Sequence, residues 1–322
     1  MNKLKQEKTK KSPIIQILSI GEALVEFMAS KIDQRLDQPG EFLGPFASGA
    51  PAIFIGQAAK LGVSAKLIAC LGKDSFGQLI ETQLKKYGAD ITGLIFLEGY
   101  TTGCAFVSYD NKGDRQFIFH MKDAACGQLN TKIVSQENWS DYMHLHLMGS
   151  TLINSGIIEL SIKACKLIKK HGGTISLDPN IRPELVDDEQ IFGLKEILKK
   201  CDYFMPSESE ITSLSQSNQT DQAIKEYLDL GIKEVVIKLG KKGAAAHTKR
   251  QTYEQPGFLV NEVDPTGAGD VFGGAYLSAR LQGEGIERSL KEACACGAQA
   301  VTLQGPMEGL FDRTQLDHFL SN

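Results

Sequence analysis

The sequence predicts an α/β protein with a mostly parallel central sheet, and three observations support this fold class. Short apolar runs rich in β-branched residues alternate with amphipathic helical patterns along most of the 322 residues. Glycines end several helical patterns just before the next apolar run, as at Gly62, Gly88 and Gly231. No internal repeat or interdomain linker interrupts this alternation. Such alternation is typical of a parallel sheet with helices on both faces.

The expected strands are short and apolar, and the expected helices are amphipathic. Strands of the main sheet are predicted at residues 14–20, 65–70, 143–148, 174–177, 203–205 and 234–238. Helices are predicted at residues 52–61, 76–87, 157–170, 190–200, 221–229, 268–282 and 286–302. Asp74 or Ser75 is expected to cap the second helix, because both side chains accept hydrogen bonds from free backbone N–H groups.

Additional strand-like pieces do not follow this alternation. They lie at residues 25–28, 41–43, 104–109 and 115–120. The last two are joined by residues 110–114, whose Asp, Asn and Gly content is typical of a hairpin link. We expect these strands, within 25–45 and 95–121, to form a small β lid over the active site or an interface with another subunit. One domain would then span residues 13–322.

Composition limits the class of protein. A hydrophobic fraction of 42%, a charged fraction of 23% and a net charge of −4 indicate a globular protein and give no support for a nucleic-acid partner. No apolar run approaches ~18 residues, so no membrane span is expected. The seven cysteines form no C-x-x-C pair, which favours reduced thiols in a cytoplasmic protein. The lysine-rich residues 1–12 are expected to be a flexible basic tail without a secretory apolar core.

The segment most informative about chemistry is the run D-P-T-G-A-G-D-V-F at residues 264–272, which opens a predicted helix. Glycine lets the backbone turn sharply and approach a ligand, and the N–H groups of Gly267, Ala268, Gly269 and Asp270 would form an anion site suited to phosphate. A carboxylate at Asp270 would repel phosphate, so we interpret it as the base that accepts a proton from an attacking hydroxyl. The alternative is an ordinary acid that stabilises the helix dipole.

This nine-residue run resembles the second signature of the PfkB/ribokinase family of carbohydrate kinases. Segments that resemble other parts of the family pattern lie at residues 21–24, 48–52, 71–77, 178–183, 206–210 and 238–243, so the resemblance covers nearly the whole chain. It implies a ribokinase-like three-layer α/β sandwich with a β lid. It also implies ATP-dependent phosphorylation of a sugar with Mg²⁺, and in some members a monovalent cation such as K⁺ near the position of Asp264.

The resemblance implies a role for individual residues as well. Sugar-binding residues would be Glu26, Ser48, Gly49, Ala50, Asn180 and Arg182. Nucleotide-binding residues would be Ser207, Lys238, Gly240, Gly243, Thr266 and Cys294. The acid expected to organise Mg²⁺ is Glu210. The chain departs from the family pattern at Ile53, where an asparagine is usual, and at Ser207 and Cys294. An isoleucine cannot hydrogen-bond a sugar hydroxyl, so Ile53 bears most directly on the choice of sugar.

A neutral ketohexose, such as fructose or tagatose, is the expected substrate. In members that resemble 2-keto-3-deoxygluconate kinase, an arginine near the end of the lid strand meets the substrate carboxylate, and Met121 takes that place here. Arg115 shares the face of Met121 but lies six residues away, whereas Lys122 points to the opposite face. Arg182 is the remaining carboxylate partner, so a 2-keto-3-deoxygluconate-type sugar acid is the alternative substrate.

Two functions of other classes also find some support in the sequence. Gly267, Gly269 and Gly273 fit a loose dinucleotide fingerprint, but two helices follow and little chain is left for a second strand with its acid. A non-enzymatic sugar sensor is suggested by Ile53, Ser207 and Cys294, whereas the retained Asp270 favours an enzyme. The expected partners are a small sugar and ATP, and the lid is expected to form a homodimer interface.

Overall fold

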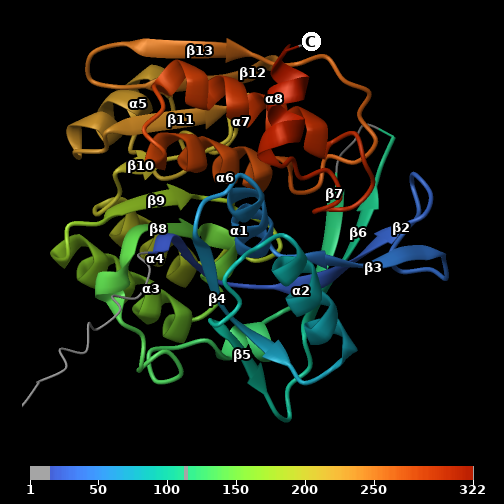
Figure 1. The fold of residues 1–322 in the computed structure, drawn as a ribbon. Coiled ribbons are helices and arrows are strands. Elements are labelled where there is room, and N and C mark those ends of the chain that lie inside the picture. Colours follow the sequence, from blue (N-terminus) through green and yellow to red (C-terminus); the bar gives the residue numbers. More distant parts are fainter. Residues whose placement is uncertain (1–14, 112–114, 322) are drawn as a thin grey trace, which may run out of the picture.

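The computed structural model describes residues 15–111 and 115–321. The basic tail expected at 1–12 and part of the hairpin link at 110–114 lie outside the described residues. Within these ranges, helices that combine the length and the apolar character needed to cross a bilayer are absent. The fold is an α/β sandwich with a second, smaller sheet, which confirms the predicted fold class (Figure 1).

Nine strands form the large sheet within the described ranges, in the order β13-β12-β11-β10-β9-β8-β1-β4-β5. From β5 to β11 all neighbours are parallel, and β12 and β13 add an antiparallel edge. The strands are β1 (Ile15–Ile20), β4 (Ala65–Gly72), β5 (Leu94–Leu97), β8 (Tyr142–Met148), β9 (Thr174–Asp178), β10 (Tyr203–Phe204), β11 (Glu234–Lys238), β12 (Gly243–His247) and β13 (Thr252–Pro256).

Helices cover both faces of this sheet, as the alternation predicts. One apolar core lies between the sheet and α1 (Ala50–Lys60), α2 (Ser75–Lys86), α6 (Ala268–Leu281), α7 (Ile286–Ala300) and α8 (Arg313–Ser321). The other lies between the sheet and α3 (Ser155–Lys170), α4 (Asp188–Leu198) and α5 (Thr220–Asp229). Asp74 caps α2 by accepting a hydrogen bond from the Gly77 N–H at 2.9 Å, as expected.

Four elements were not predicted: β5, β12, β13 and α8. The sequence of β12, Gly-Ala-Ala-Ala-His, lacks the β-branched residues that mark strands, and cross-strand pairing with β11 and β13 overrides its low propensity. Leu94–Leu97 pairs in parallel with β4 in the large sheet. The predicted lid range of 95–121 therefore begins too early, since its first residues belong to the main sheet.

The smaller sheet confirms the predicted lid strands. It has the order β3-β2-β6-β7 and is built from β2 (Leu24–Ala29), β3 (Phe42–Ser48), β6 (Gly103–Tyr109) and β7 (Arg115–His120). Cross-strand partners Phe27, Phe106 and Ile118 form a row on one face of this sheet. The alternate residues of β7, including Phe117 and Phe119, face a pocket beneath it. The four lid strands extend from one end of the large sheet (Figure 1).

Side chains of α1 and α2 hold the segment before α8 in place. The Gln57 side-chain amide donates to the Phe311 carbonyl at 2.9 Å and accepts from the Phe311 N–H at 3.3 Å. The Lys60 ammonium donates to the Leu310 carbonyl at 2.5 Å, and the Tyr87 hydroxyl donates to the Met307 carbonyl at 2.8 Å. The N-terminal and C-terminal parts of the chain are therefore joined directly.

Two histidines of β8 are buried in the sheet. His144 contacts the hydroxyls of Thr174 and Ser176, each at 2.7 Å, and His146 contacts Ser176 at 2.6 Å. Burial lowers the pKa of His144 to about 3 and the pKa of His146 well below its ordinary value. Both rings are therefore neutral at physiological pH and serve as polar contacts between strands.

Candidate active site

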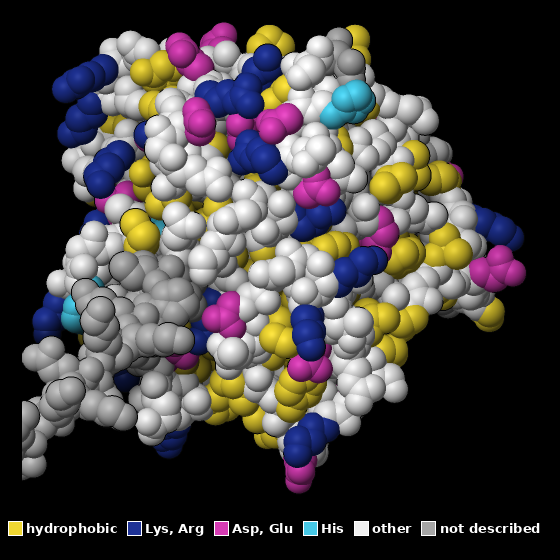
Figure 2. Space-filling view, in the orientation of Figure 1, with side chains coloured by type: hydrophobic (Ala, Val, Ile, Leu, Met, Phe, Trp, Pro, Cys, Tyr) yellow, Lys and Arg dark blue, Asp and Glu magenta, His cyan; other side chains and the backbone are white. Residues whose placement is uncertain are grey.

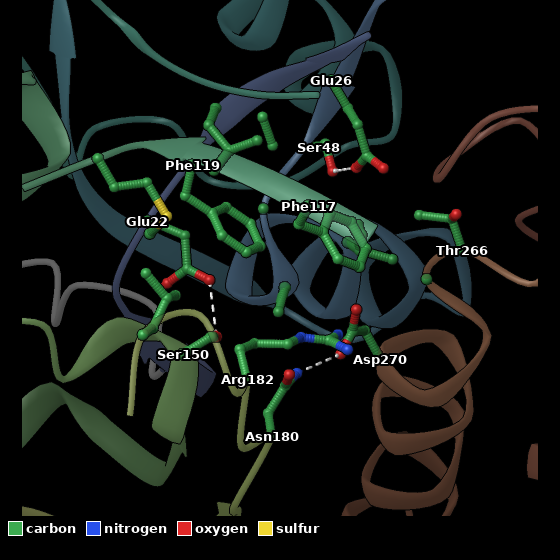
Figure 3. A pocket seen from close by; sticks show the side chains of 18 of the residues that line it. Glu22, Glu26, Ser48, Phe117, Phe119, Ser150, Asn180, Arg182, Thr266 and Asp270 are labelled. Carbon is green, nitrogen blue, oxygen red and sulfur yellow. Dashed lines mark hydrogen bonds between the residues drawn. The ribbon is translucent and has the colours of Figure 1, made fainter. Parts of the chain in front are cut away.

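Two pockets meet at the N-terminus of α6. The lid pocket lies beneath the small sheet, and Figure 3 shows its side chains converging from both sheets and from α6. It is lined by Glu22, Leu24, Glu26, Ser48, Gly49, Ala50, Ile53, Ala105, Arg115, Phe117, Phe119, Met121, Ser150, Asn180, Arg182, Leu185, Thr266, Gly267 and Asp270. The helix pocket, of about 500 Å³, is lined by Lys238, Gly240, Lys241, Gly243, Gly257, Phe258, Leu259, Val260, Glu262, Pro265, Ala268, Gly269, Phe272, Cys294, Gly297, Ala298 and Val301.

The turn that separates the pockets is the glycine-rich run of the sequence. Gly267 is the N-cap of α6 and has a left-handed φ of 77°, which favours glycine. A Cβ on Gly267 would lie 2.7 Å from the carbonyl oxygen of Pro306, so a side chain is also excluded by contact. Ala268 and Gly269 follow on the side of the helix pocket. The Ala268 N–H donates to the Pro265 carbonyl at 3.4 Å, and the other N–H groups of this first turn are suited to an anion, so the anion site stays a prediction.

Asp270 lies in the first turn of α6 and faces the lid pocket (Figure 3). The residue is 6% exposed, and its Oδ1 accepts a hydrogen bond from the Asn180 side chain at 3.2 Å. Burial raises the pKa of Asp270 to about 7; the nearby Asp178 raises it further, whereas Arg182 and Lys238 oppose the shift. A carboxyl group with this pKa can accept a proton near neutral pH.

Glu26 reaches the opposite side of the lid pocket from β2. Its Oε2 accepts a hydrogen bond from the Ser48 hydroxyl at 2.8 Å, whereas its buried Oε1 has no hydrogen-bond partner among the described residues. Burial raises the pKa of Glu26 to about 7, and the bond from Ser48 opposes this shift. A buried oxygen without a partner is suited to a hydroxyl of a bound ligand. Gly49 (φ 106°) and Ala50 complete this wall, as the sequence predicts.

The loop after β9 supplies Asn180 and Arg182 to the same pocket. Asn180 has a φ of 35°, a left-handed value that asparagine tolerates better than most residues. This backbone directs its side-chain amide to Asp270. The Arg182 guanidinium lies 5.6 Å from the centre of the Phe117 ring of β7. The loop after β9 therefore contacts α6 through Asn180 and the lid through Arg182.

Several pocket residues were not selected from the sequence. Arg115 lines the lid pocket although it was set aside as too far from Met121, because alternate residues of one strand all face the same cavity. Its guanidinium lies 5.8 Å from the centre of the Phe117 ring. Glu22 was also missed; it accepts hydrogen bonds from Ser150, at 2.8 Å, and Thr151. The strict alternation of residues 115–121 was the available signal for Arg115.

The predicted nucleotide residues divide into three groups. Lys238, Gly240, Gly243 and Cys294 all line the helix pocket, as expected. Thr266 lines the lid pocket instead, because the chain turns at Gly267 and leaves Thr266 on the other side. Ser207 lines neither pocket; its N–H and hydroxyl both donate to Glu210 Oε2, at 2.8 and 2.6 Å.

Glu210 joins two loops at the carboxyl edge of the sheet. Its Oε1 accepts the Ile181 N–H at 2.8 Å, so both carboxylate oxygens already have donors. Although burial acts to raise it, the charge of Lys238 and the bonds from Ser207 and Ile181 hold the pKa of Glu210 below its ordinary value. Among the described residues no group of three or more His, Cys, Asp or Glu side chains could hold a metal ion.

Ile53 lies in α1 and is buried against the glycine-rich turn. Atoms of its side chain are 3.2 and 3.4 Å from the position that a Cβ of Gly267 would take. Ile53 also lines the lid pocket, where it supplies an apolar surface and no hydrogen bond. Ile53, the residue that departs from the family pattern, is therefore part of the wall of the lid pocket.

Comparison with known proteins agrees with this geometry. The sequence model of the "pfkB family carbohydrate kinase" matches residues 16–312. Fructokinase-2 of Oryza sativa subsp. japonica is 31% identical over 306 residues, which cover 91% of this chain and 90% of the relative. The Escherichia coli protein described as "a putative Ribokinase II", in complex with ATP and Mg²⁺, is 44% identical, with a TM-score of 0.90 over 95% of this chain and 99% of that one.

A third relative was solved with a sugar. A double mutant of the fructokinase of Vibrio cholerae O395, in fructose, ADP and potassium ion bound form, is 26% identical, with a TM-score of 0.81 over 96% of this chain and 100% of that one. The three relatives cover 91%, 95% and 96% of this chain, which favours the kinase interpretation over a dinucleotide-dependent oxidoreductase. The chain belongs to the pfkB family of carbohydrate kinases.

Proposed function

We propose that this kinase transfers the γ-phosphoryl group of ATP to a terminal hydroxyl of a neutral ketohexose. The observation that carries the proposal is the position of Asp270, a buried carboxyl group with a pKa near 7 at a helix N-terminus between two pockets. The lid pocket would hold the sugar, and the helix pocket would hold the nucleotide. The helix pocket has a volume of about 500 Å³ and a largely apolar lining, which suit a nucleotide.

The proposed mechanism uses groups that are already in place. Asp270 accepts the proton of the sugar hydroxyl as its oxygen attacks the γ-phosphorus, and ADP leaves with the electron pair of the broken P–O bond. The N–H groups of Gly267, Ala268, Gly269 and Asp270 stabilise the charge on the transferring group. Glu26 and Ser48 hold sugar hydroxyls at the far side of the cavity, and the aromatic rings of β7 exclude water.

The proposal includes two cations because related structures contain them. Related structures contain Mg²⁺ with ATP, and in one case K⁺. Because both oxygens of Glu210 accept protein hydrogen bonds, we propose that Mg²⁺ is held mainly by phosphates and water, with Glu210 near it. When bound, Mg²⁺ neutralises charge on the phosphate oxygens. Asp264 would adjoin a K⁺ site, which replacing KCl by choline chloride in the assay would test.

The neutral ketohexose rests on two observations. The relatives named fructokinase span most of the chain, and Met121 stands in the lid pocket where a sugar-acid kinase would need an arginine. Arg115 and Arg182 line the same cavity, so a 2-keto-3-deoxygluconate-type acid is the second candidate. The seven cysteines, all at described positions, are free, which agrees with the proposed action in the reducing cytoplasm.

A substrate panel tests the proposal. ADP release would be measured with fructose, tagatose, ribose and 2-keto-3-deoxygluconate, and the substrates compared by kcat/KM. We expect the highest value for a ketohexose. A clear preference for the keto acid would replace the ketohexose with the second candidate, and no turnover with any sugar would favour a sensor built on the kinase fold.

We also propose a homodimer through the lid. The face of the small sheet opposite the lid pocket carries Phe42 and Ile118, which are 36% and 42% exposed. Figure 2 shows hydrophobic side chains gathered over the lid strands, at the right of the view. Light scattering coupled to size-exclusion chromatography should give twice the monomer mass for the wild type. Ile118→Asp should shift it toward monomer, and a wild-type monomer would refute the interface.

A further inference from the structure

The side chain of Lys238 reaches the glycine-rich turn from the end of β11. Its Nζ lies 3.5 Å from the position that a Cβ of Gly269 would take, on the wall of the helix pocket. Its side chain is 15% exposed, in contrast to the exposed Lys241 of the same pocket. An ammonium group therefore lies next to Gly269, in the turn whose N–H groups are proposed to bind the anion.

Asp178, at the end of β9, holds this ammonium in place. Its side chain is 1% exposed and forms an ion pair with Lys238 through Oδ2, while Oδ1 accepts the Asn180 N–H at 3.2 Å. The Asn180 side chain in turn donates to Asp270. Four residues from three parts of the chain, Lys238, Asp178, Asn180 and Asp270, thus form one connected polar path beside the turn.

Lys238 is charged in this setting. Burial alone would lower the pKa of Lys238, but the carboxylates of Asp178, Glu210 and Asp270 raise it above its ordinary value. A fixed positive charge next to the anion site is suited to the oxygens of a transferring phosphoryl group, on which negative charge is spread in the transition state. The surrounding low dielectric strengthens this interaction relative to water.

We propose that Lys238 is a further catalytic residue whose ammonium contacts the transferring phosphoryl group, and that Asp178 is the positioning residue that holds it over Gly269. The inference deepens the proposed phosphoryl transfer and rests on it. Lys238 neither gives nor takes a proton in this step. The oxygen–phosphorus bond to the sugar forms, the bond to the ADP oxygen breaks, and the hydroxyl proton goes to Asp270.

The main test compares Lys238→Met with Lys242→Met. Lys242 lies on the same turn, but it is exposed and pairs with Glu208 outside both pockets. We expect Lys238→Met to lower kcat ~10²–10³-fold, as loss of one charge-stabilising donor does, with the sugar KM and the ADP dissociation constant within about twofold of wild type. Lys242→Met should retain wild-type kcat. More than half of the wild-type kcat in a folded Lys238→Met would overturn the inference.

A second variant keeps the inference testable if Lys238→Met does not fold. Removing Lys238 alone leaves the buried Asp178 without its partner, which destabilises proteins strongly. The pair Asp178→Asn/Lys238→Met removes both charges and should fold. If Asp178 acts through Lys238, the kcat of the pair should equal that of Lys238→Met instead of the product of the two single effects. If the kcat of the pair instead shows the product of the two single effects, Asp178 does not act through Lys238.

The pH profile tests whether the charge of Lys238 acts on Asp270. Asp270 is faced by Asp178 from the end of β9, by Arg182 from the loop after it, by Lys238 from the end of β11 and by Glu22 from the turn after β1. Because Lys238 opposes the rise in the Asp270 pKa, Lys238→Met should shift the acid limb of kcat/KM to higher pH. An unchanged limb would count against the inference. Even with an unchanged limb, the proposed function would stand if the wild-type protein turns over sugar and Asp270→Asn does not.

Discussion

The Tyr109 hydroxyl of lid strand β6 donates a hydrogen bond to Asp264 Oδ1 at 2.7 Å and also contacts the Thr266 hydroxyl. Asp264 Oδ1 accepts the Thr266 N–H as well, at 3.0 Å, and Oδ2 accepts the Gly305 N–H at 2.9 Å. The lid is therefore tied to the loop that leads into the anion site, and the position of one depends on the other.

Tyr109→Phe should uncouple the lid from this loop. A hydrogen bond to a charged group contributes ~1.5–3 kcal/mol, so we expect kcat/KM for the sugar to fall about tenfold or more. Tyr100→Phe, at an exposed position of the loop before β6, is the matched control and should match wild type. Steady-state kinetics of both variants would check this, and equal values for the two would show that the contact is dispensable.

Asp270→Asn should separate activity from stability. We expect turnover to fall ~10²–10⁴-fold, the usual contribution of a positioned base. Burial disfavours the ionised carboxylate of Asp270, so a neutral amide of the same shape should leave the melting temperature unchanged or raise it. Single-turnover kinetics and calorimetry would measure both. A lower melting temperature with near-normal turnover would return Asp270 to a structural role.

The pH dependence of kcat/KM follows from the raised pKa of Asp270. The base must be ionised to accept a proton, and its pKa in the folded protein is about 7. Activity should therefore fall about tenfold for each pH unit below 7. Glu26→Gln should raise the sugar KM and keep the limb that belongs to Asp270. An acid limb near pH 4 in the wild type would contradict the assignment.

Gly269→Ala and Gly267→Ala should fail in different ways. A Cβ on Gly269 would meet only Lys238, at ordinary contact distances of 3.5 and 3.8 Å, so the fold should persist while phosphate approach is hindered. A Cβ on Gly267 would lie 2.7 Å from the Pro306 carbonyl at a left-handed φ, so the fold itself should lose stability. Thermal melts with titration of an ATP analogue would distinguish the two; equal melting temperatures would refute the contrast.

Acid should destabilise the protein through His144 and His146. Their pKa values are lowered in the folded state by burial, so the unfolded chain binds more protons below its ordinary histidine pKa of about 6.5. The stability they support is complete above that pH and decreases as the pH falls toward 3. At pH 5 the loss from His144 is about 2 kcal/mol, and His146 adds to it in the same direction. His144→Gln should flatten the dependence of urea midpoint on pH between 7 and 5, and an unaltered slope would refute the assignment.

Local sequence patterns predicted most of the fold, because most helices and strands bury an apolar face and several helices end at a glycine. The alternation of strands and helices defined the parallel sheet from β1 to β11. The antiparallel edge was missed because the alanines of β12 and the polar residues of β13 become a strand pair only by pairing with β11. Residues 95–97 fell within the predicted lid range because a short apolar run does not indicate which sheet it joins.

The site was predicted where a continuous run of sequence carries the chemistry. Asp270 and its glycines lie within nine residues, and this run together with its family resemblance indicated an anion site with a base. The ion pair of Asp178 and Lys238 joins residues 60 positions apart and depends on the order of strands in the sheet. Thr266 was assigned to the nucleotide because sequence does not reveal the sharp turn at Gly267 that separates the two pockets.

The contacts of Gln57 with Phe311 have a consequence for biosynthesis. The two residues are 254 positions apart, so the face of α1 that receives Phe311 is left incomplete until the ribosome has added these later residues. Apolar surface exposed during synthesis favours aggregation and chaperone binding. A message truncated before codon 307 would encode a chain without Phe311. The apolar face of α1 would stay exposed in that chain, and quality-control proteases can recognise such a surface.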